Sequence, residues 1–350
     1  MTTPVPVAAT APHDPTPPVP PIAGQLPGCE ADLAGRLTEG LGRVEAFLRA
    51  RVDHEDPFIA EASAHLLGAG GKRFRPLLCL LAAEVGDGAG EDVVAAAAAV
   101  ELTHLASLYH DDVMDEASLR RGAVSANAAY GNSTAILVGD LLFGTASEIV
   151  ADLGPEAVKI QARTFVTLCA GQIRDVRSAP AGVDPVEYYL GVLRDKTGSL
   201  ISTAARYGAM FSGCAPESIE VLAAYGERLG MAFQLADDLL DITATSGASG
   251  KTPGTDLREG VDTLPVLWAK RSTDPADARL QELLAADLAA DDEAHAEALA
   301  LLRVHPAVAQ AAEHTRGVAR EAAALLAPLG SSPVTRALIG LATGVVDRHV

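Results

Sequence analysis

Residues 101–115, ELTHLASLYHDDVMD, decide the fold: an apolar helical run ends in the pattern Asp-Asp-x-x-Asp. Residues 231–242, MAFQLADDLLDI, repeat the arrangement, with an apolar run that leads into the same pattern. Long apolar segments broken only at Gly and Pro are typical of helices. The two stretches therefore predict two buried helices, each ending in a cluster of aspartates.

The aspartates of each cluster share a helix face, because positions i and i+4 lie one above the other. Asp111 and Asp115 are paired in this way, with Asp112 beside them. The second triplet consists of Asp237, Asp238 and Asp241. Oxygen ligands without sulfur or clustered imidazole suit Mg²⁺, which shares its coordination shell with phosphate oxygens. The two triplets thus predict Mg²⁺ sites with a diphosphate between them.

A solvated helix face is the alternative interpretation of a single triplet. The turns that precede both triplets, residues 101–109 and 231–236, are mostly apolar, which favours carboxylates that project into a cavity. The 12-residue Ca²⁺ loop, with its central Gly and terminal Glu, is absent from the sequence. The repeated pattern therefore favours a site for Mg²⁺ over a Ca²⁺ sensor.

Basic residues gather where they could meet the same ligand. Residues 70–76, GGKRFRP, put three cations at a glycine-rich turn that enters a helix, which suits phosphate binding. His104 lies two helical turns before Asp111 and so near the same face. A buried core histidine is its alternative interpretation, and we treat His110 as structural. Further candidate residues are the cations Arg120, Arg121, Lys196 and Lys251, together with Thr197 beside Lys196.

Composition limits the class of protein. The chain has 350 residues, 49% of them hydrophobic and 4% aromatic, which favours an all-α globular protein. The formal charge of −19 argues against nucleic acid and anionic membrane surfaces as partners. The four cysteines lack metal-ligand spacing. With no signal peptide and no uninterrupted apolar run of roughly 18 residues, we expect a cytoplasmic protein.

The chain divides into a tail and one domain. Residues 1–28 hold nine of the 21 prolines and almost no charge, which predicts a disordered or extended tail. Residues 29–350 read as about a dozen helices that form one helical bundle. The expected breaks fall at 68–71, 86–90, 154–155, 179–185, 215–216, 246–254 and 330–333.

Five stretches together resemble the trans-isoprenyl (polyprenyl) diphosphate synthase family, from about Leu37 to Arg348. They are GGKRFRP, ELTHLASLYHDDVMDEASLRRG, LRDKTGSLISTAARYGA, MAFQLADDLLDI and GKTPGTDLREGVDTLP. The resemblance implies an isoprenoid-synthase bundle with a central cavity and a homodimer. It also implies a Mg²⁺-dependent transferase that condenses isopentenyl diphosphate with an allylic prenyl diphosphate and releases diphosphate.

The resemblance also implies roles for individual residues. Isopentenyl diphosphate would contact Lys72, Arg75, His104 and Arg121. The allylic diphosphate would contact Arg120, Lys196, Thr197, Gln234 and Lys251. The six aspartates would carry Mg²⁺. Five of them would also act in catalysis together with Lys196: Asp111, Asp112, Asp115, Asp237 and Asp238. Val261 and Gln172 depart from the family, which usually has Lys and commonly Glu at these positions.

Product length depends on the helix that ends in Asp111. Counting back along its face, Ser107, Ala106 and Thr103 are all small, so no aromatic side chain blocks the growing chain near the diphosphate. This predicts a medium- or long-chain all-trans product, with geranylgeranyl or farnesyl diphosphate as the alternative. The alternative is that small residues there serve close helix packing, and that Phe143 or another residue on a neighbouring helix closes the end of the cavity that holds the growing chain.

Two other functions compete with elongation. A type I terpene cyclase also uses Asp-Asp-x-x-Asp. Its second metal site usually differs, however, and it needs no binding site for isopentenyl diphosphate. A non-catalytic partner subunit tolerates loss of metal ligands, and none is lost here. Both triplets together with GGKRFRP therefore favour the synthase.

Overall fold

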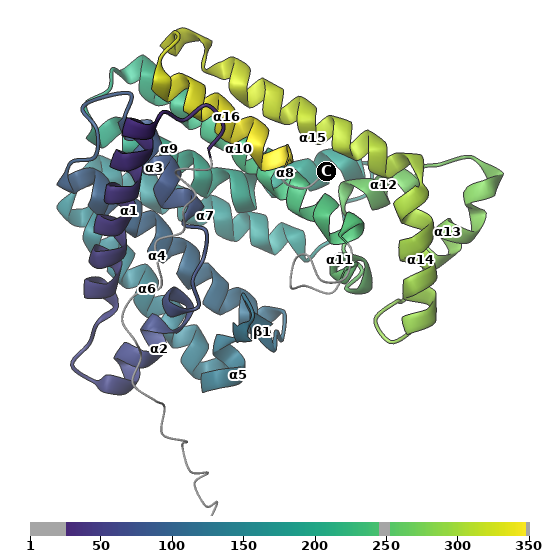
Figure 1. Cartoon of the computed structure of the whole chain (residues 1–350). Coiled ribbons are helices and arrows are strands. Elements are labelled where there is room, and N and C mark those ends of the chain that lie inside the picture. The colour runs from purple at the N-terminus through teal and green to yellow at the C-terminus, as the bar shows by residue number, and fades with distance from the viewer. Residues whose placement is uncertain (1–25, 245–252, 348–350) are drawn as a thin grey trace, which may run out of the picture.

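The computed structural model describes residues 26–244 and 253–347, and helices make up most of them (Figure 1). They are, in chain order, α1 (Ala31–Val52), α2 (Pro57–Gly68), α3 (Phe74–Ala83), α4 (Glu91–Met114), α5 (Ala126–Tyr130), α6 (Asn132–Asp152), α7 (Pro155–Asp175), α8 (Pro185–Leu193), α9 (Ser199–Phe211), α10 (Pro216–Thr243), α11 (Thr255–Arg258), α12 (Leu264–Lys270), α13 (Ala278–Leu284), α14 (Asp292–Val304), α15 (Pro306–Leu325) and α16 (Pro333–Asp347). The predicted all-α class is confirmed.

Short elements connect the helices. A π-helical turn, η2 (Arg194–Gly198), joins α8 to α9, and the 3₁₀ turns are η3 (Pro275–Asp277) and η4 (Ala327–Leu329). The strands β1 (Leu119–Arg120) and β2 (Ala123–Val124) form an antiparallel hairpin just after α4. The sequence pattern did not indicate this hairpin, because two-residue strands carry no periodicity.

Proline and capping aspartates start several helices, and for α7, α8 and α10 these starts fall at the expected breaks. Asp56 and Asp184 accept hydrogen bonds from backbone N–H groups in the first turns of α2 and α8, and a proline follows each of them. The helices α7, α10 and α15 also have proline in the first turn. These signals explain why the helix boundaries could be predicted from the sequence.

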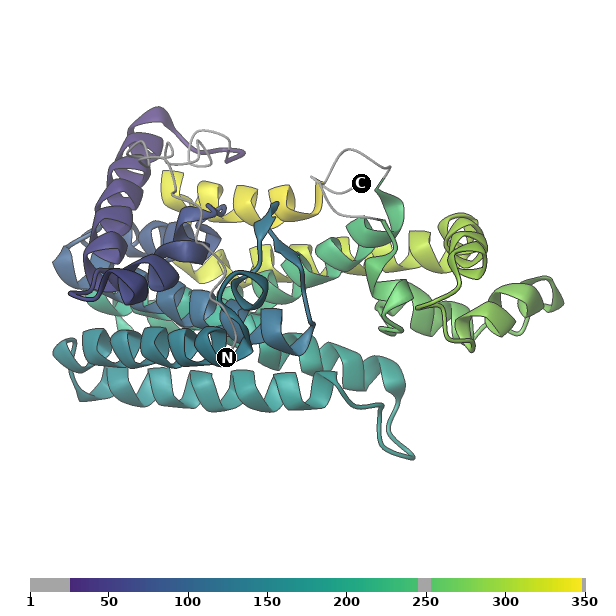
Figure 2. The same cartoon turned by 90° about the horizontal axis from the view of Figure 1, so that it is seen from below.

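The core lies around α4, which is buried over most of its length. The helices α1, α3, α6 and α9 pack against it, and α10 packs against α9 and α15 (Figures 1 and 2). Four consecutive alanines of α4, Ala96 to Ala99, are fully buried, so the neighbouring helices approach closely. The paired helices α13 and α14 lie at the end of the molecule away from α1 (Figure 1).

Two further observations concern the predicted tail and the most apolar helices. Leu26 is only 4% exposed and so is buried ahead of the expected domain start at residue 29, and residues 1–25 of the predicted tail lie outside the described residues. By length and composition, α4 and α6 are also apolar enough to cross a membrane. Charged residues such as Glu101 of α4 and Asp140 of α6 interrupt both apolar stretches, so neither is an uninterrupted apolar run. About 72% of the apolar window of α4 is buried inside the protein, and 39% of that of α6.

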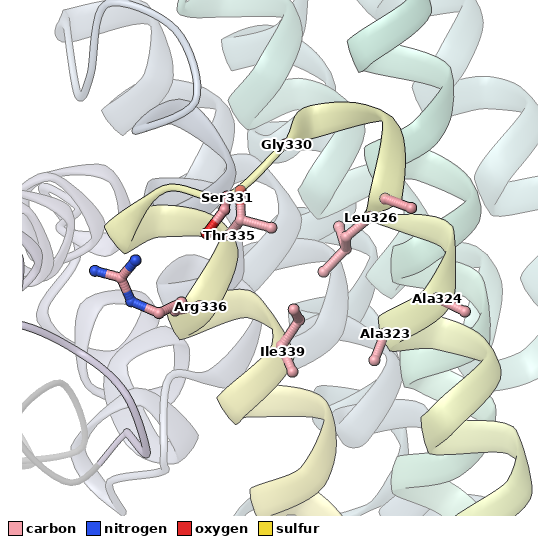
Figure 3. A pocket seen from close by; sticks show the side chains of 9 residues that line it. Ala323, Ala324, Leu326, Gly330, Ser331, Thr335, Arg336 and Ile339 are labelled. Carbon is pink, nitrogen blue, oxygen red and sulfur yellow. The ribbon is translucent and has the colours of Figure 1, made fainter.

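A shallow apolar groove of about 220 Å³ lies where η4 joins α15 to α16 (Figure 3). Ala323, Leu326 and Ile339 line it, and Arg336 at its edge pairs with Glu30 at 2.5 Å. None of the residues that the sequence indicates for function lines this groove. The groove therefore plays no part in the site described below.

Gly208 of α9 permits the close approach of α3, and this suggests a stability test. A Cβ at this position would lie 2.0 Å from the carbonyl oxygen of Cys79. We expect Gly208→Ala to lower the free energy of unfolding by about 1–3 kcal/mol, because the two backbones must separate. Urea-induced unfolding followed by circular dichroism measures the change.

Gly35→Ala is the matched control, because Gly35 is an exposed residue of α1 and a Cβ there meets nothing within 4 Å. This substitution should raise the free energy of unfolding by roughly 0.4–1 kcal/mol, since it removes freedom from the unfolded chain. Equal effects of the two substitutions would contradict the close packing of α3 and α9.

Candidate active site

The first aspartate triplet lies at the end of α4, where the β1–β2 hairpin folds back over it. Asp112 is fully buried and accepts hydrogen bonds from Nε of Arg120 (2.5 Å) and the backbone N–H of Ala126 (3.1 Å). Nη2 of Arg120 also lies 3.7 Å from the carboxylate of Asp115, which is exposed. Arg120, predicted as a substrate contact, therefore also holds this aspartate triplet in place.

Asp111 is the member of this triplet whose charge is least well compensated. Burial raises the pKa of Asp111 to about 6, and the negative charges of Asp115 and Asp112 add to the effect. The charges of Lys196 and Arg120 act in the opposite direction without cancelling it. A carboxylate in this position is stabilised by further positive charge, which a bound cation would supply.

The second triplet lies near the end of α10 and is held by different partners. Asp238 is 7% exposed and accepts hydrogen bonds from the hydroxyl of Tyr189 and from Nε2 of Gln234 (3.0 Å). Burial raises the pKa of Asp238 to about 6. Asp241 accepts from the backbone N–H groups of Thr255 (3.1 Å) and Asp256 (3.0 Å) and so caps α11.

The π-helical turn η2 connects the two triplets. Its Lys196 pairs with Asp175 (2.6 Å), and its charge also acts on Asp111. The next residue, Thr197, donates to Oε1 of Gln234 (3.2 Å), and Gln234 in turn bonds Asp238. Single π turns occur often at functional sites because they redirect side chains within a helix. Here the turn places Lys196 and Thr197 between the two acidic clusters.

These residues fit a hard divalent cation that is shared with a substrate. Their ligand atoms are carboxylate oxygens, which Mg²⁺ prefers. Among the described residues, no group of three or more His, Cys, Asp or Glu side chains is placed to hold a metal ion. Mg²⁺ commonly takes only one or two carboxylates and completes its shell with phosphate oxygens and water. The site therefore suits a metal that binds together with a phosphate-bearing ligand.

The predicted glycine-rich turn lies between α2 and α3 and contributes a structural arginine. Arg73 has a left-handed backbone (φ 46°) and is 7% exposed. Its guanidinium pairs with Glu45 of α1 (3.0 Å) and Glu101 of α4 (3.2 Å) and donates to the Leu67 carbonyl (3.0 Å). Arg73 therefore fixes the turn, and the exposed Lys72 beside it remains a predicted ligand contact.

Arg75, His104 and Arg121 form a basic cluster next to this turn. Burial lowers the pKa of Arg75 to about 10, and its Nε atom is buried without a hydrogen-bond partner among the described residues. Burial, together with the charges of Arg75 and Arg121, holds the pKa of His104 well below its ordinary value, so the imidazole is neutral at pH 7. Buried, partly unpaired cations of this kind suit an anionic ligand.

Gly71 makes room for Arg121 in this cluster. Its φ of 147° is rare for a residue with a side chain, and a Cβ there would lie 2.7 Å from Nη1 of Arg121. The same guanidinium donates to the carbonyl of Gly70. The glycine-rich turn and the arginine pair after the first triplet, 51 residues apart, are thus brought together as the sequence predicts.

The remaining predicted residues have different outcomes. Thr103 and Ala106 of α4 are fully buried, and Ser107 donates to the carbonyl of His104 (2.8 Å). Lys251 lies outside the described residues. Val261 is 41% exposed.

Sequence reasoning missed Glu101, Asp175 and Tyr189. Glu101 is 2% exposed, and its negative charge acts on Arg73, Arg75 and Arg121. A single charge inside the apolar run of α4 was the signal for it, since isolated buried charges need partners. Asp175 and Tyr189 follow no pattern, because their contacts with Lys196 and Asp238 arise only from packing.

Removal of the Glu101 charge should destabilise the protein. Glu101→Gln leaves a buried arginine cluster with less compensating charge, so we expect the free energy of unfolding to fall by about 3 kcal/mol. Urea-induced unfolding at pH 7 measures the change.

Glu297→Gln is the control, because the Arg279–Glu297 pair is exposed to solvent and such pairs contribute little. An equally small effect of both substitutions would show that Glu101 does not stabilise the cluster.

Comparison with known proteins agrees with this geometry. The profile of the polyprenyl synthetase family matches residues 56–302. A nonaprenyl diphosphate synthase from Mycobacterium tuberculosis is 48% identical over 91% of this chain and 96% of its own length.

Two solved structures have the same fold. A geranylgeranyl pyrophosphate synthase from Corynebacterium glutamicum, complexed with calcium and isoprenyl diphosphate, has a TM-score of 0.82 and 43% identity over 91% of this chain and 98% of that one. A decaprenyl diphosphate synthase from Rhodobacter capsulatus has a TM-score of 0.82 and 35% identity over 91% and 99%. The chain therefore belongs to the polyprenyl synthetase family and is a transferase of the prenyl diphosphate synthase class.

Proposed function

We propose that the protein is a Mg²⁺-dependent trans-polyprenyl diphosphate synthase that adds isopentenyl diphosphate to an allylic prenyl diphosphate. The observation that carries this proposal is the arrangement of two acidic triplets, linked through Lys196, Thr197 and Gln234, beside a cluster of incompletely paired cations. A reaction between two diphosphates needs two such anion sites. The relative complexed with calcium and isoprenyl diphosphate supports a divalent metal.

The acidic triplets are the proposed site of the allylic diphosphate. Bound Mg²⁺ would neutralise the diphosphate and make it a better leaving group. Lys196 and Arg120 already lie next to the aspartates, so they can donate hydrogen bonds to the departing oxygens. Thr197, Gln234 and Lys251 are the further contacts that we propose for this diphosphate.

The basic cluster is the proposed site of isopentenyl diphosphate. Lys72, Arg75 and Arg121 supply positive charge, and the neutral His104 can donate one hydrogen bond. Held there, the isopentenyl double bond attacks the allylic carbon as its bond to oxygen breaks. The proton lost from the new chain passes to the released diphosphate, so no separate side-chain base is needed. The buried surroundings exclude water from the allylic cation.

A medium- to long-chain product agrees with both the relatives and the site. The nonaprenyl and decaprenyl synthases among the relatives make long chains by name. Ala106 and Ser107 offer no bulky side chain along α4 below Asp111. A geranylgeranyl product is the second candidate, because the similar enzyme from Corynebacterium glutamicum bears that name.

A direct test of the reaction is to incubate the purified protein with labelled isopentenyl diphosphate, Mg²⁺ and, separately, dimethylallyl, geranyl, farnesyl or geranylgeranyl diphosphate. Sizing the products gives both activity and length. A Mg²⁺-dependent ladder that ends well beyond four units is expected. A ladder that stops at four units would favour the geranylgeranyl product, and no elongation with any primer would refute the proposed function.

Single changes in the triplets should abolish elongation without unfolding the protein. Asp111→Ala and Asp237→Ala should each lower kcat by at least roughly 10²-fold, because each removes a group that stabilises the departing charge. Asp87→Ala, in the loop between α3 and α4, is the control and should retain normal kcat. Near-normal turnover of either triplet variant would contradict the assigned role.

An exposed apolar face on α6 and α7 supports the proposed homodimer. The two helices lie side by side along one edge of the molecule (Figure 2). Leu137 of α6 and Val166 and Ile173 of α7 are 66%, 68% and 61% exposed. Large exposed apolar side chains gathered on two adjacent helices typically mark a protein interface. We propose that a second copy of the chain covers this face, in keeping with a soluble cytoplasmic enzyme.

Val166→Lys should disrupt this dimer because it places a charge in the apolar interface. Size-exclusion chromatography with light scattering should show a dimer for the unmodified protein and a monomer for the variant. Val304→Lys is the control, since Val304 is 82% exposed but lies on α14. A dimer that survives both Val166→Lys and Leu137→Lys would place the interface elsewhere.

A further inference from the structure

Helix α14 contacts the end of α10 that carries the second aspartate triplet. It packs against α10 and also against α11, the short helix that follows (Figure 1). Ile242 of α10 and Leu257 of α11 are buried in the same apolar cluster as Leu299 and Leu302 of α14. The end of α10 and the start of α11 therefore share one small core with a helix much later in the chain.

Arg303 of α14 binds the last turn of α10. Its Nε atom donates to the carbonyl of Ile242 (2.7 Å), and its Nη2 atom donates to the carbonyl of Ala244 (2.7 Å). The last carbonyls of a helix have no partner inside the helix, and a positive charge near them is favourable. Arg303 therefore fixes the end of α10 at the residues that directly follow Asp241.

His295 of α14 anchors the start of α11. Its Nε2 atom donates to the carbonyl of Gly254 (2.8 Å), and its Nδ1 atom accepts from Nη2 of Arg258 (3.2 Å). Both ring nitrogens are thus used, because a carbonyl only accepts and a guanidinium only donates. Arg258 also pairs with Asp292 of α14 (2.8 Å). His295 is 5% exposed, so water competes little for these bonds.

The two anchors converge on Asp241. One carboxylate oxygen accepts from the backbone N–H of Thr255, and the other accepts from that of Asp256. The carbonyl of Asp241 accepts from the backbone N–H of Gly254 (2.8 Å). The direction in which this carboxylate points is therefore set by α11, which His295 holds, and its height by the end of α10, which Arg303 holds.

We propose that Arg303 and His295 are positioning residues for Asp241, and that α14 in this way sets how tightly the second triplet binds a Mg²⁺–diphosphate complex. This inference rests on the proposed function. Arg303 acts through the backbone of α10, and His295 acts through α11. A carboxylate that is already held in place need not be ordered when the ligand binds, so loss of either anchor weakens binding.

Calorimetric titration of the full-length protein with inorganic diphosphate tests the proposal without turnover. Titrations with and without excess Mg²⁺ give the Kd of the Mg²⁺-dependent binding. Arg303→Met and His295→Leu each replace an anchor by an apolar side chain. Each should raise this Kd by roughly 10- to 100-fold, the range for groups that hold metal ligands in place. Partial unfolding would instead lower the number of binding sites and leave Kd unchanged.

Variants that combine these changes with Asp241→Ala separate positioning from a general effect on the site. Asp241→Ala should itself raise Kd. Neither Arg303→Met nor His295→Leu should raise it further in that background, because the residue through which they act is gone. Additive effects in the double variants would show that the anchors act elsewhere and would overturn the proposal.

Two kinds of control accompany these variants. Arg279→Met makes the same chemical change on α13, where Arg279 pairs with Glu297 of α14 (2.6 Å) at the surface, and should leave Kd unchanged. Arg303→Lys and His295→Gln each keep a hydrogen-bond donor for a carbonyl that the anchor holds. Both should therefore bind Mg²⁺–diphosphate more tightly than Arg303→Met and His295→Leu.

Failure of the proposal differs from failure of the proposed function. Unchanged Kd in both Arg303→Met and His295→Leu would overturn the positioning role, and elongation of an allylic primer by the unmodified protein would leave the function intact. If the unmodified protein showed neither Mg²⁺-dependent binding of diphosphate nor elongation, the proposed function itself would be refuted.

Discussion

Burial of carboxylates is the constraint on which the rest of the site depends. Burial raises the pKa of both Asp111 and Asp238 to about 6, so each triplet holds charge that the protein only partly compensates. Long apolar helices place these aspartates inside the protein, and Arg120, Tyr189 and Lys196 hold them there. The remaining deficit of positive charge is what makes the site fit a metal-bound diphosphate.

The basic cluster beside the glycine-rich turn has the opposite imbalance, because its positive charge is only partly compensated. Arg73 is neutralised by Glu45 and Glu101, whereas Arg75 keeps a buried nitrogen without a described partner. Because the chain as a whole carries a formal charge of −19, this positive site is local and depends on the glycine-rich turn that shapes it. These acidic and basic halves are the two anion sites that we propose for the condensation of two diphosphates.

The sequence predicted the features that depend on repeated motifs and on residues that end helices. The all-α class, the helix breaks at glycine and proline, and the family were confirmed, because they depend on local propensity and on motif order. The Asp238–Tyr189 and Lys196–Asp175 contacts could not be predicted, since they join helices far apart in the chain. The roles of the site residues stay predictions.

The most direct measurement of the central claim is a crystal structure of the protein with diphosphate and Mn²⁺, which replaces Mg²⁺ and can be located by its anomalous scattering. The account predicts one diphosphate between the triplets, with Mn²⁺ bound to oxygens of Asp111 or Asp115 on one side and of Asp237 or Asp241 on the other. Mn²⁺ at only one triplet, or diphosphate bound away from both, would contradict it.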